Sequence, residues 1–540
     1  MQHLDTARAA RLGEALDAEE LARLRAASDD TARELLATEG YFSPQIESTL
    51  TQQGDAPLLR YAVTPGPRTH VRSVKIDFTG ALAAADQERR RQRAEARFTL
   101  KPEMPFRQAD WTAAKAALMG SLLAGRYPSA QLASSEARID PATHAADLTL
   151  TVDSGPAFYY GEPVVSGSQR YPASIIRHLS PLKPGQPVRQ QDLLDYQAAL
   201  ETSGYYAQAM LRIEPDPALA AAVPIQVEVV ERPAKTFSVG AGISTDTGPR
   251  VSGTWLHRNI LEKGLRLKLD ARLETSRQTG EAELAWPRNA KGYDNSLGVR
   301  YKLEDIEGQE TESVGLIARR TRARGNIEAT LSLQYQNETQ EIGNVLSARN
   351  QALAANYSWT LRTVGRTFYP RRGYVLNLQG GGAAEALLSD TSFLRLYARH
   401  TQYFSAGDRG RVILRGEFGS VLSDRVEGIP TDFLFRAGGD NSVRGYKYQS
   451  LGRQVAGGVE SVRYLATGSA EYDYYFGGNW GAAVFIDAGN AADSLGELNP
   501  VFGYGLGLRY RTPVGPINLD LAYGEDTGDY RLHFLLGVTF

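Results

Sequence analysis

The chain of 540 residues contains no cysteine. Without thiols it can have no disulfide framework, no thiolate metal site and no cysteine nucleophile. It also lacks an excess of one charge, because 60 lysine and arginine residues face 62 aspartate and glutamate residues, for a formal net charge of −2. This balance gives no reason to expect nucleic acid as a partner. No apolar run reaches the roughly 18 residues of a membrane-spanning helix.

Sequence signatures of enzymes and cofactor sites are missing too. The chain has no Gly-x-Ser-x-Gly elbow, no His-Glu-x-x-His pair and no Walker phosphate loop. Its seven His residues do not have the spacing of metal ligands. The repeat Gly503-x-Gly505-x-Gly507 lies inside strand-like sequence, where it is typical of strand curvature. We therefore expect no catalytic residue, no metal and no cofactor.

The sequence from about residue 236 onward alternates apolar and polar residues. Residues 265–273 read Leu-Arg-Leu-Lys-Leu-Asp-Ala-Arg-Leu, and residues 504–510, 517–523 and 532–540 follow the same pattern. One such strand fits a soluble sandwich as well as a membrane barrel. About 305 residues, at roughly 19 per strand and connection, give about 16 strands long enough to cross a bilayer. A soluble sheet of this size would be unusual, so we predict a 16-stranded antiparallel transmembrane β-barrel.

The first 233 residues repeat one pattern three times. In each copy a helical stretch runs into a glycine and an aromatic residue, two strands follow, and a turn containing proline ends the unit. The glycines are Gly40, Gly125 and Gly204. A spacing of roughly 80 residues indicates a small domain and not a solenoid repeat. Each glycine provides the left-handed residue that ends a helix.

The second and third copies also begin with a strand, so their elements follow the order β-α-α-β-β of a small α+β domain. The predicted domains cover residues 1–67, 68–157 and 158–233, with the barrel at 234–540. The first copy opens directly in helical sequence at residues 7–24, and no signal peptide precedes it. We therefore expect Met1 to lie inside the first domain, one strand late.

Residues 436–448 read Arg-Ala-Gly-Gly-Asp-Asn-Ser-Val-Arg-Gly-Tyr-Lys-Tyr and are too rich in glycine and charge for a strand, which indicates a loop. Glu471 and Asp473 lie on the polar face of a nearby strand, and Asp487 faces inward from the next one. An arginine-bearing loop beside inward carboxylates can form charge-assisted, bidentate contacts. The alternative is an ordinary solvent-exposed turn.

Three motifs resemble the barrel-assembly-factor superfamily of outer membranes, which includes BamA, TamA and the two-partner secretion transporters. They are Val443-Arg444-Gly445-Tyr446, Phe485-Ile486-Asp487-Ala488-Gly489 and Pro370-Arg371-Arg372-Gly373. The preceding units resemble its POTRA domains. The resemblance implies three tandem α+β POTRA domains in the periplasm followed by an outer-membrane barrel. Within the superfamily, three POTRA domains are typical of TamA, five of bacterial BamA and two of the secretion transporters.

The resemblance also implies the positions of the functional residues. It places Arg444 inside the barrel lumen, held by Asp487 and Glu471. The barrel closes where its first strand, near residues 237–244, pairs with its last, near 531–540. These strands are rich in glycine, so we expect a weak seam that opens as a lateral gate and accepts a substrate strand. The predicted seam residues are Gly240, Gly242, Gly537 and Phe540.

These features predict a factor that inserts or translocates β-barrel and autotransporter substrates through the seam, without catalysis. The expected partners are a TamB-like periplasm-spanning protein on the first POTRA domain, unfolded outer-membrane proteins, the lipid bilayer and lipopolysaccharide. The basic run at residues 319–324 is expected at a hairpin end or on the lumen face, with lipopolysaccharide contact as the alternative. The alternative function is a two-partner-type pore that secretes one polypeptide.

Overall fold

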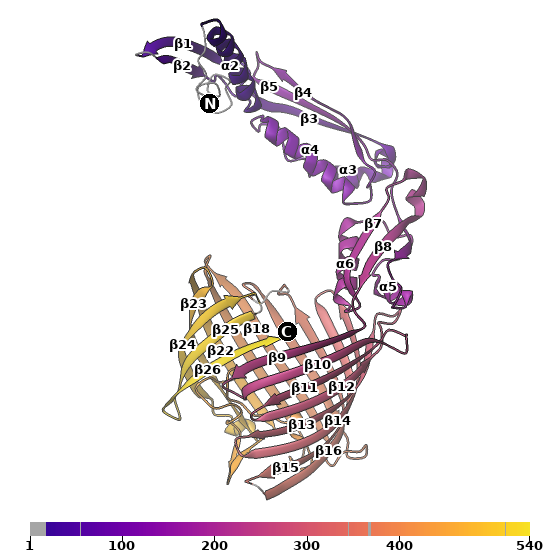
Figure 1. Cartoon of the computed structure of the whole chain (residues 1–540), viewed down its shortest axis with the longest axis vertical. Helices are drawn as coiled ribbons and strands as arrows, with labels where there is room; N and C mark the ends of the chain where they lie inside the picture. Colours follow the sequence, from indigo (N-terminus) through magenta and orange to yellow (C-terminus); the bar gives the residue numbers. More distant parts are fainter. Residues whose placement is uncertain (1–17, 54–55, 344, 366–368, 514, 540) are drawn as a thin grey trace. The chain divides into compact units, whose positions relative to one another are not determined.

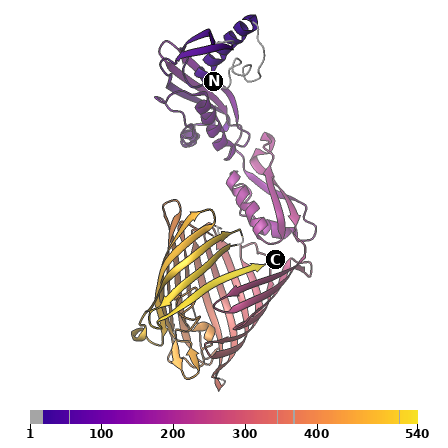
Figure 2. The ribbon, with the colours of Figure 1, turned by 60° about the vertical axis from the view of Figure 1, so that its left-hand side comes forward.

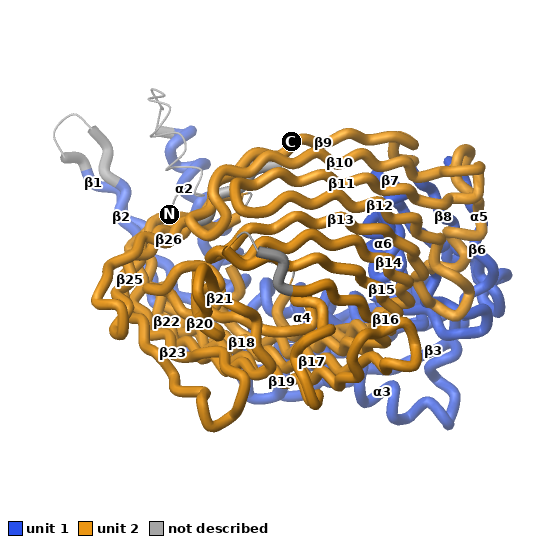
Figure 3. The backbone as a smooth tube through the Cα atoms, turned by 90° about the horizontal axis from the view of Figure 1, so that it is seen from below, with its two compact units in different colours: residues 1–167, 180–230 blue, residues 168–179, 231–540 orange. Residues whose placement is uncertain are grey.

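The computed structural model describes residues 18–53, 56–343, 345–365, 369–513 and 515–539. These residues form two compact units, one of residues 1–167 and 180–230 and the other of residues 168–179 and 231–540 (Figure 3). None of the described helices is both long and apolar enough to span a membrane.

The first unit begins with the helix α2 (Ala18–Thr38) and the antiparallel strands β1 (Gln45–Gln53) and β2 (Ala56–Thr64). The helix ends just before Gly40, whose φ of +93° is in the left-handed region that favours glycine. Among the described residues no strand precedes α2. Most of the helical sequence predicted at residues 7–24 lies outside the described residues.

The second copy of the pattern has the predicted order β-α-α-β-β. Its elements are β3 (His70–Thr79), the short turns η1 (Gly80–Ala83) and η2 (Ala85–Gln87), α3 (Glu88–Glu95), α4 (Gln108–Leu123), β4 (Gln131–Asp140) and β5 (Ala145–Asp153). The sheet order is β3-β5-β4, with β3 parallel to β5 (Figure 1). Trp111, Leu118 and Leu122 share one face of α4 and join a buried cluster with Leu148 and Leu150 of β5. This burial provides the domain's core.

The third copy repeats the same order. Its elements are β6 (Tyr160–Ser166), α5 (Ala173–Leu179), α6 (Gln190–Thr202), β7 (Tyr206–Ile213), η3 (Pro217–Ala222) and β8 (Val223–Glu231), with the sheet order β6-β8-β7. The segment that contains α5 belongs to the barrel unit. The Glu231 carboxylate accepts backbone N–H groups of Gln169, Arg170 and Tyr171, which ties this segment to the chain that enters the barrel.

The rest of the chain forms a closed antiparallel barrel of sixteen strands, which confirms the predicted strand number. The strands are β9 (Lys235–Ser244), β10 (Gly248–Ile260), β11 (Leu265–Glu274), β12 (Arg277–Ala285), β13 (Asp294–Ile306), β14 (Gln309–Arg324), β15 (Ile327–Ile342), β16 (Val345–Arg362), β17 (Gly373–Ala383), β18 (Phe393–Ala406), β19 (Gly410–Leu422), β22 (Tyr464–Gly477), β23 (Trp480–Ala492), β24 (Val501–Thr512), β25 (Gly515–Gly524) and β26 (Asp529–Thr539).

The barrel strands have an apolar outer face and a polar inner face. On β22, Glu471 and Asp473 are buried, whereas the alternating Tyr472, Tyr474 and Phe476 are exposed. Such alternation follows from the two-residue period of a strand and suits a wall between lipid and lumen. The alternation predicted from the sequence is therefore confirmed.

The long loop at residues 423–463 joins β19 to β22 and packs against the inner wall. It carries η4 (Thr431–Phe433) and a small hairpin of β20 (Arg453–Val455) and β21 (Gly458–Glu460). Phe433 and Phe435 of the loop join a buried cluster with Phe393 and Val421 of the barrel. A β carbon at Gly419 would overlap the Phe435 ring, so this glycine gives the loop its place on the wall.

Candidate functional site

Arg444 lies in this loop and is only 3% exposed. Its guanidinium donates two hydrogen bonds to Asp487 of β23, from Nε to Oδ2 at 2.7 Å and from Nη2 to Oδ1 at 3.0 Å. Its Nη1 donates to Glu471 of β22 at 2.7 Å and to Asp520 of β25 at 2.9 Å. Its Cζ lies 3.4 Å from the centroid of the Phe485 ring. The loop is thus fixed to the inner wall by charge-assisted, bidentate contacts.

A second buried arginine connects the same carboxylates to one another. Arg509 of β24 is 2% exposed and donates from Nη2 to Oε1 of Glu471 at 2.8 Å. It also contacts Oδ1 of Asp473 at 3.3 Å and forms an ion pair with Asp520. Arg411 of β19 donates to the other oxygen of Asp473 at 2.8 Å. The contacts therefore extend from β19 across the wall to β25.

We call this group the arginine cluster. It consists of Arg411, Arg415, Arg444 and Arg509 with Glu471, Asp473, Asp487 and Asp520. Arg411, Arg444 and Arg509 form ion pairs with these carboxylates, whereas Arg415 donates to the Ser469 hydroxyl at 3.0 Å. The ion pairs matter because a charge buried without a partner is strongly destabilising. The paired members therefore hold one another in place.

The glycine repeat of β24 has a role that its sequence did not predict. A β carbon at Gly503 would overlap the carbonyl of Arg444, and one at Gly507 would overlap the Asp520 carboxylate. We expected these glycines to allow strand curvature. In the structure they leave the space that the loop and the arginine cluster occupy.

The other residues of the loop motif support Arg444 from both sides. Val443 is fully buried. Gly445 has a φ of +95°, which a residue with a side chain rarely adopts. The Tyr446 hydroxyl donates to the Phe502 carbonyl at 3.2 Å and accepts the N–H of Asp526 at 3.1 Å. The whole predicted motif is thus in contact with the barrel wall, not in an ordinary exposed turn.

Several residues of this region were not singled out from the sequence, among them Arg509, Asp520 and His533. A signal for the first two existed, because they occupy polar positions of the alternating sequences at 504–510 and 517–523. His533 occupies a polar position of the last strand in the same way. Alternation showed that these side chains face the lumen, but it could not show which partners they meet there.

The barrel closes where β26 pairs with β9 (Figure 2). The pairing runs from Leu535 to Thr539 against Ser244 to Gly240, so Gly242 is directly opposite Gly537, and Gly240 is opposite Thr539. Both strands begin two residues earlier than predicted, at Lys235 and Asp529. The predicted seam residue Phe540 lies outside the described residues.

One group of described residues brings metal-binding side chains together. Asp246, Asp440 and His533 have their ligand atoms within 4.8 Å of one another. Both ring nitrogens of His533 are already engaged, with the N–H of Gly445 at 2.9 Å and with Asp440 at 2.6 Å. We therefore interpret the group as a hydrogen-bonded cluster.

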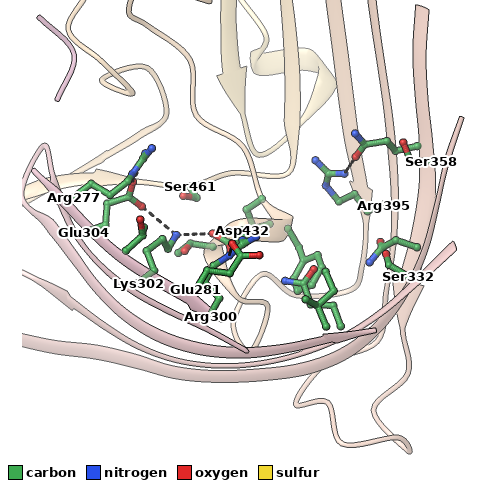
Figure 4. A pocket seen from close by; sticks show the side chains of 18 of the residues that line it. Arg277, Glu281, Arg300, Lys302, Glu304, Ser332, Ser358, Arg395, Asp432 and Ser461 are labelled. Carbon is green, nitrogen blue, oxygen red and sulfur yellow. Dashed lines mark hydrogen bonds and ion pairs between the residues drawn. The ribbon is translucent and has the colours of Figure 1, made fainter. Parts of the chain in front are cut away.

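A cavity of about 830 Å³ lies within the barrel and is lined mainly by charged and polar side chains (Figure 4). Lys302 bridges Glu304 of its own strand, at 3.2 Å, and Asp432 of the loop, at 2.5 Å. Arg319, the first residue of the basic run, lines the same cavity and forms an ion pair with Glu283 at 2.7 Å. The run therefore begins on the lumen face and ends at the tip of β14, as predicted.

Removal of the Arg444 side chain should destabilise the folded barrel. Arg444→Ala leaves the buried Asp487 carboxylate without its ion-pair partner, which costs about 3–5 kcal/mol. Arg444→Lys keeps the charge but loses the bidentate geometry, so we expect a smaller loss. Arg453→Ala is the control, because Arg453 pairs with Glu460 while 46% exposed, and such pairs contribute at most about 1 kcal/mol. The measurement is the temperature at which the barrel loses its compact migration in gel electrophoresis; equal shifts for Arg444→Ala and the control would contradict the assignment.

Comparison with known proteins places this geometry in a family. The Omp85 superfamily domain matches residues 234–540. The outer membrane protein assembly factor BamA of Nitratidesulfovibrio vulgaris is 23% identical over 426 residues, covering 74% of this chain and 53% of that protein. The chain spans between about half and two thirds of the length of the curated relatives it matches.

Solved structures share the fold. BamA from Haemophilus ducreyi lacking POTRA domains 1–3 superposes with a TM-score of 0.69 at 16% identity, covering 87% of this chain and 100% of that one. CdiB from Escherichia coli gives a TM-score of 0.52 at 13% identity, covering 95% and 96%. The barrel lies in the outer membrane, and the N-terminal domains of such proteins are periplasmic. The chain belongs to the Omp85 superfamily.

Proposed function

We propose that this chain is a TamA-like factor that assembles other outer-membrane proteins through the seam between β9 and β26. The observation that carries the proposal is the shortness of the seam. β9 pairs with β10 from Lys235 to Ser244, but with β26 only from Gly240 to Ser244 among the described residues. By contrast, β14 and β15 pair from Gln309–Ile342 through to Arg324–Ile327. The seam is where the barrel wall opens most easily.

The chemistry of a strand edge in lipid explains why such a seam is useful. Unpaired backbone N–H and C=O groups cannot be left in the bilayer core, because no water is there to bond them. A substrate strand that adds to the free edge of β9 satisfies these groups by β-augmentation. Glycines at 240 and 242 contribute little side-chain packing, so exchange of one strand for another costs little. The process uses the substrate's own folding and needs no nucleotide or cofactor.

The arginine cluster supports this proposal because it holds in place the part of the wall that lies beside the seam. It fixes the loop to β22, β23 and β25, so that the wall beside β26 keeps its shape while the seam opens. The proposed substrates are β-barrel proteins and autotransporters that arrive unfolded. The proposed partners are a TamB-like protein at residues 1–67, and lipopolysaccharide in the membrane around the barrel. The basic run does not reach the lipopolysaccharide, because it ends beside Tyr293, at the periplasmic end of the barrel where Arg288 contacts His178 of α5.

A covalent lock across the seam should stop assembly. Gly242→Cys and Gly537→Cys place two thiols directly opposite each other, at about the Cβ distance that a disulfide bridges. The chain has no cysteine of its own, so the new pair is the only one. We expect oxidation to abolish substrate insertion into liposomes and reduction to restore it. The matched control is the pair Gly416→Cys and Gly468→Cys, which lie opposite each other on β19 and β22.

The seam pair and the control pair decide the outcome together. Oxidation of the pair on β19 and β22 should leave insertion unchanged, because that part of the wall stays paired throughout. Full insertion by the oxidised seam variant would refute the gate.

Binding of the TamB-like partner can be tested by comparing the full chain with a shortened one. A chain without residues 1–67 should no longer capture this protein from solution, whereas the full chain should. Unchanged heat stability of the shortened chain's barrel shows that it is still folded. Equal capture by both chains would place the partner elsewhere or exclude it.

A second candidate, a pore that secretes one polypeptide, is favoured by the polar cavity of about 830 Å³ in the lumen. Conductance across planar bilayers separates the two functions. Because the loop packs on the inner wall and Asp432 bridges to Lys302, we expect only small, brief openings. Large steady conductance that is unaffected by the seam disulfide would favour the secretion pore.

A further inference from the structure

The last strand of the barrel carries a buried histidine that contacts the arginine loop. His533 of β26 is 6% exposed. Its Nε2 lies 2.9 Å from the backbone nitrogen of Gly445, the residue after Arg444. Because a backbone N–H can only donate, Nε2 must carry a lone pair and the ring proton must be on Nδ1. Nδ1 then donates to Asp440, 2.6 Å away in the same loop.

The same loop residue reaches the first strand of the barrel. The backbone N–H of Asp440 donates to the carboxylate of Asp246, in the turn between β9 and β10, at 3.3 Å. In that turn Thr245 exchanges hydrogen bonds with Phe534 of β26, since its N–H donates to the Phe534 carbonyl and its hydroxyl accepts the Phe534 N–H, both at 3.0 Å. Asp440 therefore lies between the two strands of the seam and contacts both sides.

We propose that Asp246, Asp440 and His533 form a latch that ties the arginine loop to both strands of the seam and exchanges protons when the seam opens. These three are positioning residues: they hold the closed seam and do not touch the substrate. The proposal rests on the proposed function in one respect, namely that the seam opens during assembly.

The surroundings of His533 are charged on both sides. Towards the lumen, Asp520 is its cross-strand neighbour on β25, and Arg444 and Arg509 both bind that carboxylate. The cavity on this side has a volume of about 190 Å³, and its other charged residues are Arg411, Arg415, Asp440 and Glu471. A cavity of about 460 Å³ on the other side is lined by the charged residues Asp246, Asp305, Glu307, Lys447 and Arg531. Arg411, Arg444 and Arg509 are each paired with carboxylates of the arginine cluster. The charged residue of the loop in direct contact with Asp246 is Asp440.

One end of the latch depends on pH. Burial and the nearby Asp440 carboxylate raise the pKa of Asp246 to about 7. Closing therefore takes up a proton at Asp246, and this contribution is present in acid and is lost as the pH rises through about 7.

Because closing takes up a proton at Asp246, the closed seam of the unmodified chain should weaken as the pH rises through about 7. His533→Gln keeps an acceptor for Gly445 and leaves Asp246 in place, so this pH dependence should remain. Asp246→Asn keeps a neutral side chain beside Asp440 but cannot titrate, so the pH dependence should disappear.

The experiment measures amide hydrogen exchange of the full chain in detergent between pH 5 and 8, in EDTA, corrected for the intrinsic pH dependence of exchange. Peptides that cover Thr245 and Phe534 report the seam, and peptides of β15 report the distant wall. In the unmodified chain and in His533→Gln, protection of the seam should fall as the pH rises through about 7, by up to about tenfold per unit, the limit for one linked proton. In Asp246→Asn it should not change with pH. His257→Gln on β10 is the control for a barrel histidine outside the latch.

A pH dependence that is lost in Asp246→Asn and is confined to the seam peptides supports the latch. A pH dependence in Asp246→Asn that matches the unmodified chain, or changes that are equal in β15, overturn it. Closure that requires added Zn²⁺ overturns it as well, because a metal would then replace the hydrogen bonds. The disulfide lock separates this result from the proposed function: loss of the pH dependence in Asp246→Asn together with insertion by the locked seam would keep the latch and reject the gate.

Discussion

The contact between Arg444 and Asp487 is the interaction on which the rest of the site depends. Burial of a guanidinium that is 3% exposed is strongly destabilising unless carboxylates meet it with good geometry, and Asp487 does so with both oxygens. Glu471 and Asp520 bind the same guanidinium and bring Arg509 into the cluster. The loop is thereby held at one height on the wall, which places Gly445 opposite His533. The ion pair between Arg444 of the loop and Asp487 of β23 therefore also determines where the latch lies.

Neighbouring strands within the barrel pair over long stretches, whereas its first and last strands pair over a short one. Long antiparallel pairings on both sides, such as those of β14 with β13 and β15, satisfy nearly every backbone group of a strand. The pairing of β26 with β9 is short and includes two directly opposed glycines. A membrane barrel cannot leave an open edge in lipid, so a weak closure is tolerated only where other contacts support it. In this chain the loop residue Asp440 and the hydroxyl of Thr245 provide that support beside the seam.

Much of the fold could be predicted from the sequence because its determinants are local. Alternation over residues 265–273 predicted β11. The left-handed glycines predicted at helix ends are present at Gly40 and Gly204 but not at Gly125, whose φ is not in that region. The contact of Arg444 with Asp487 was expected from the resemblance of their motifs. The register of the seam was not predictable, because it depends on closure across the whole barrel; Gly537 meets Gly242 and not Gly240. Neither was the His533 contact, since it depends on the path of a loop with no periodic pattern.

The most direct test of the central claim, that the seam is the working part, is photocross-linking from β9 during assembly. A photoreactive residue at Val239, which is exposed on the outer face of β9, samples the edge that a substrate strand would join. The same residue at Leu331 of β15, also exposed on the outer face, samples the distant wall. The account predicts adducts with newly made barrel proteins at Val239 and none at Leu331. Assembly that proceeds with equal adducts at both positions, or with none at Val239, would contradict it.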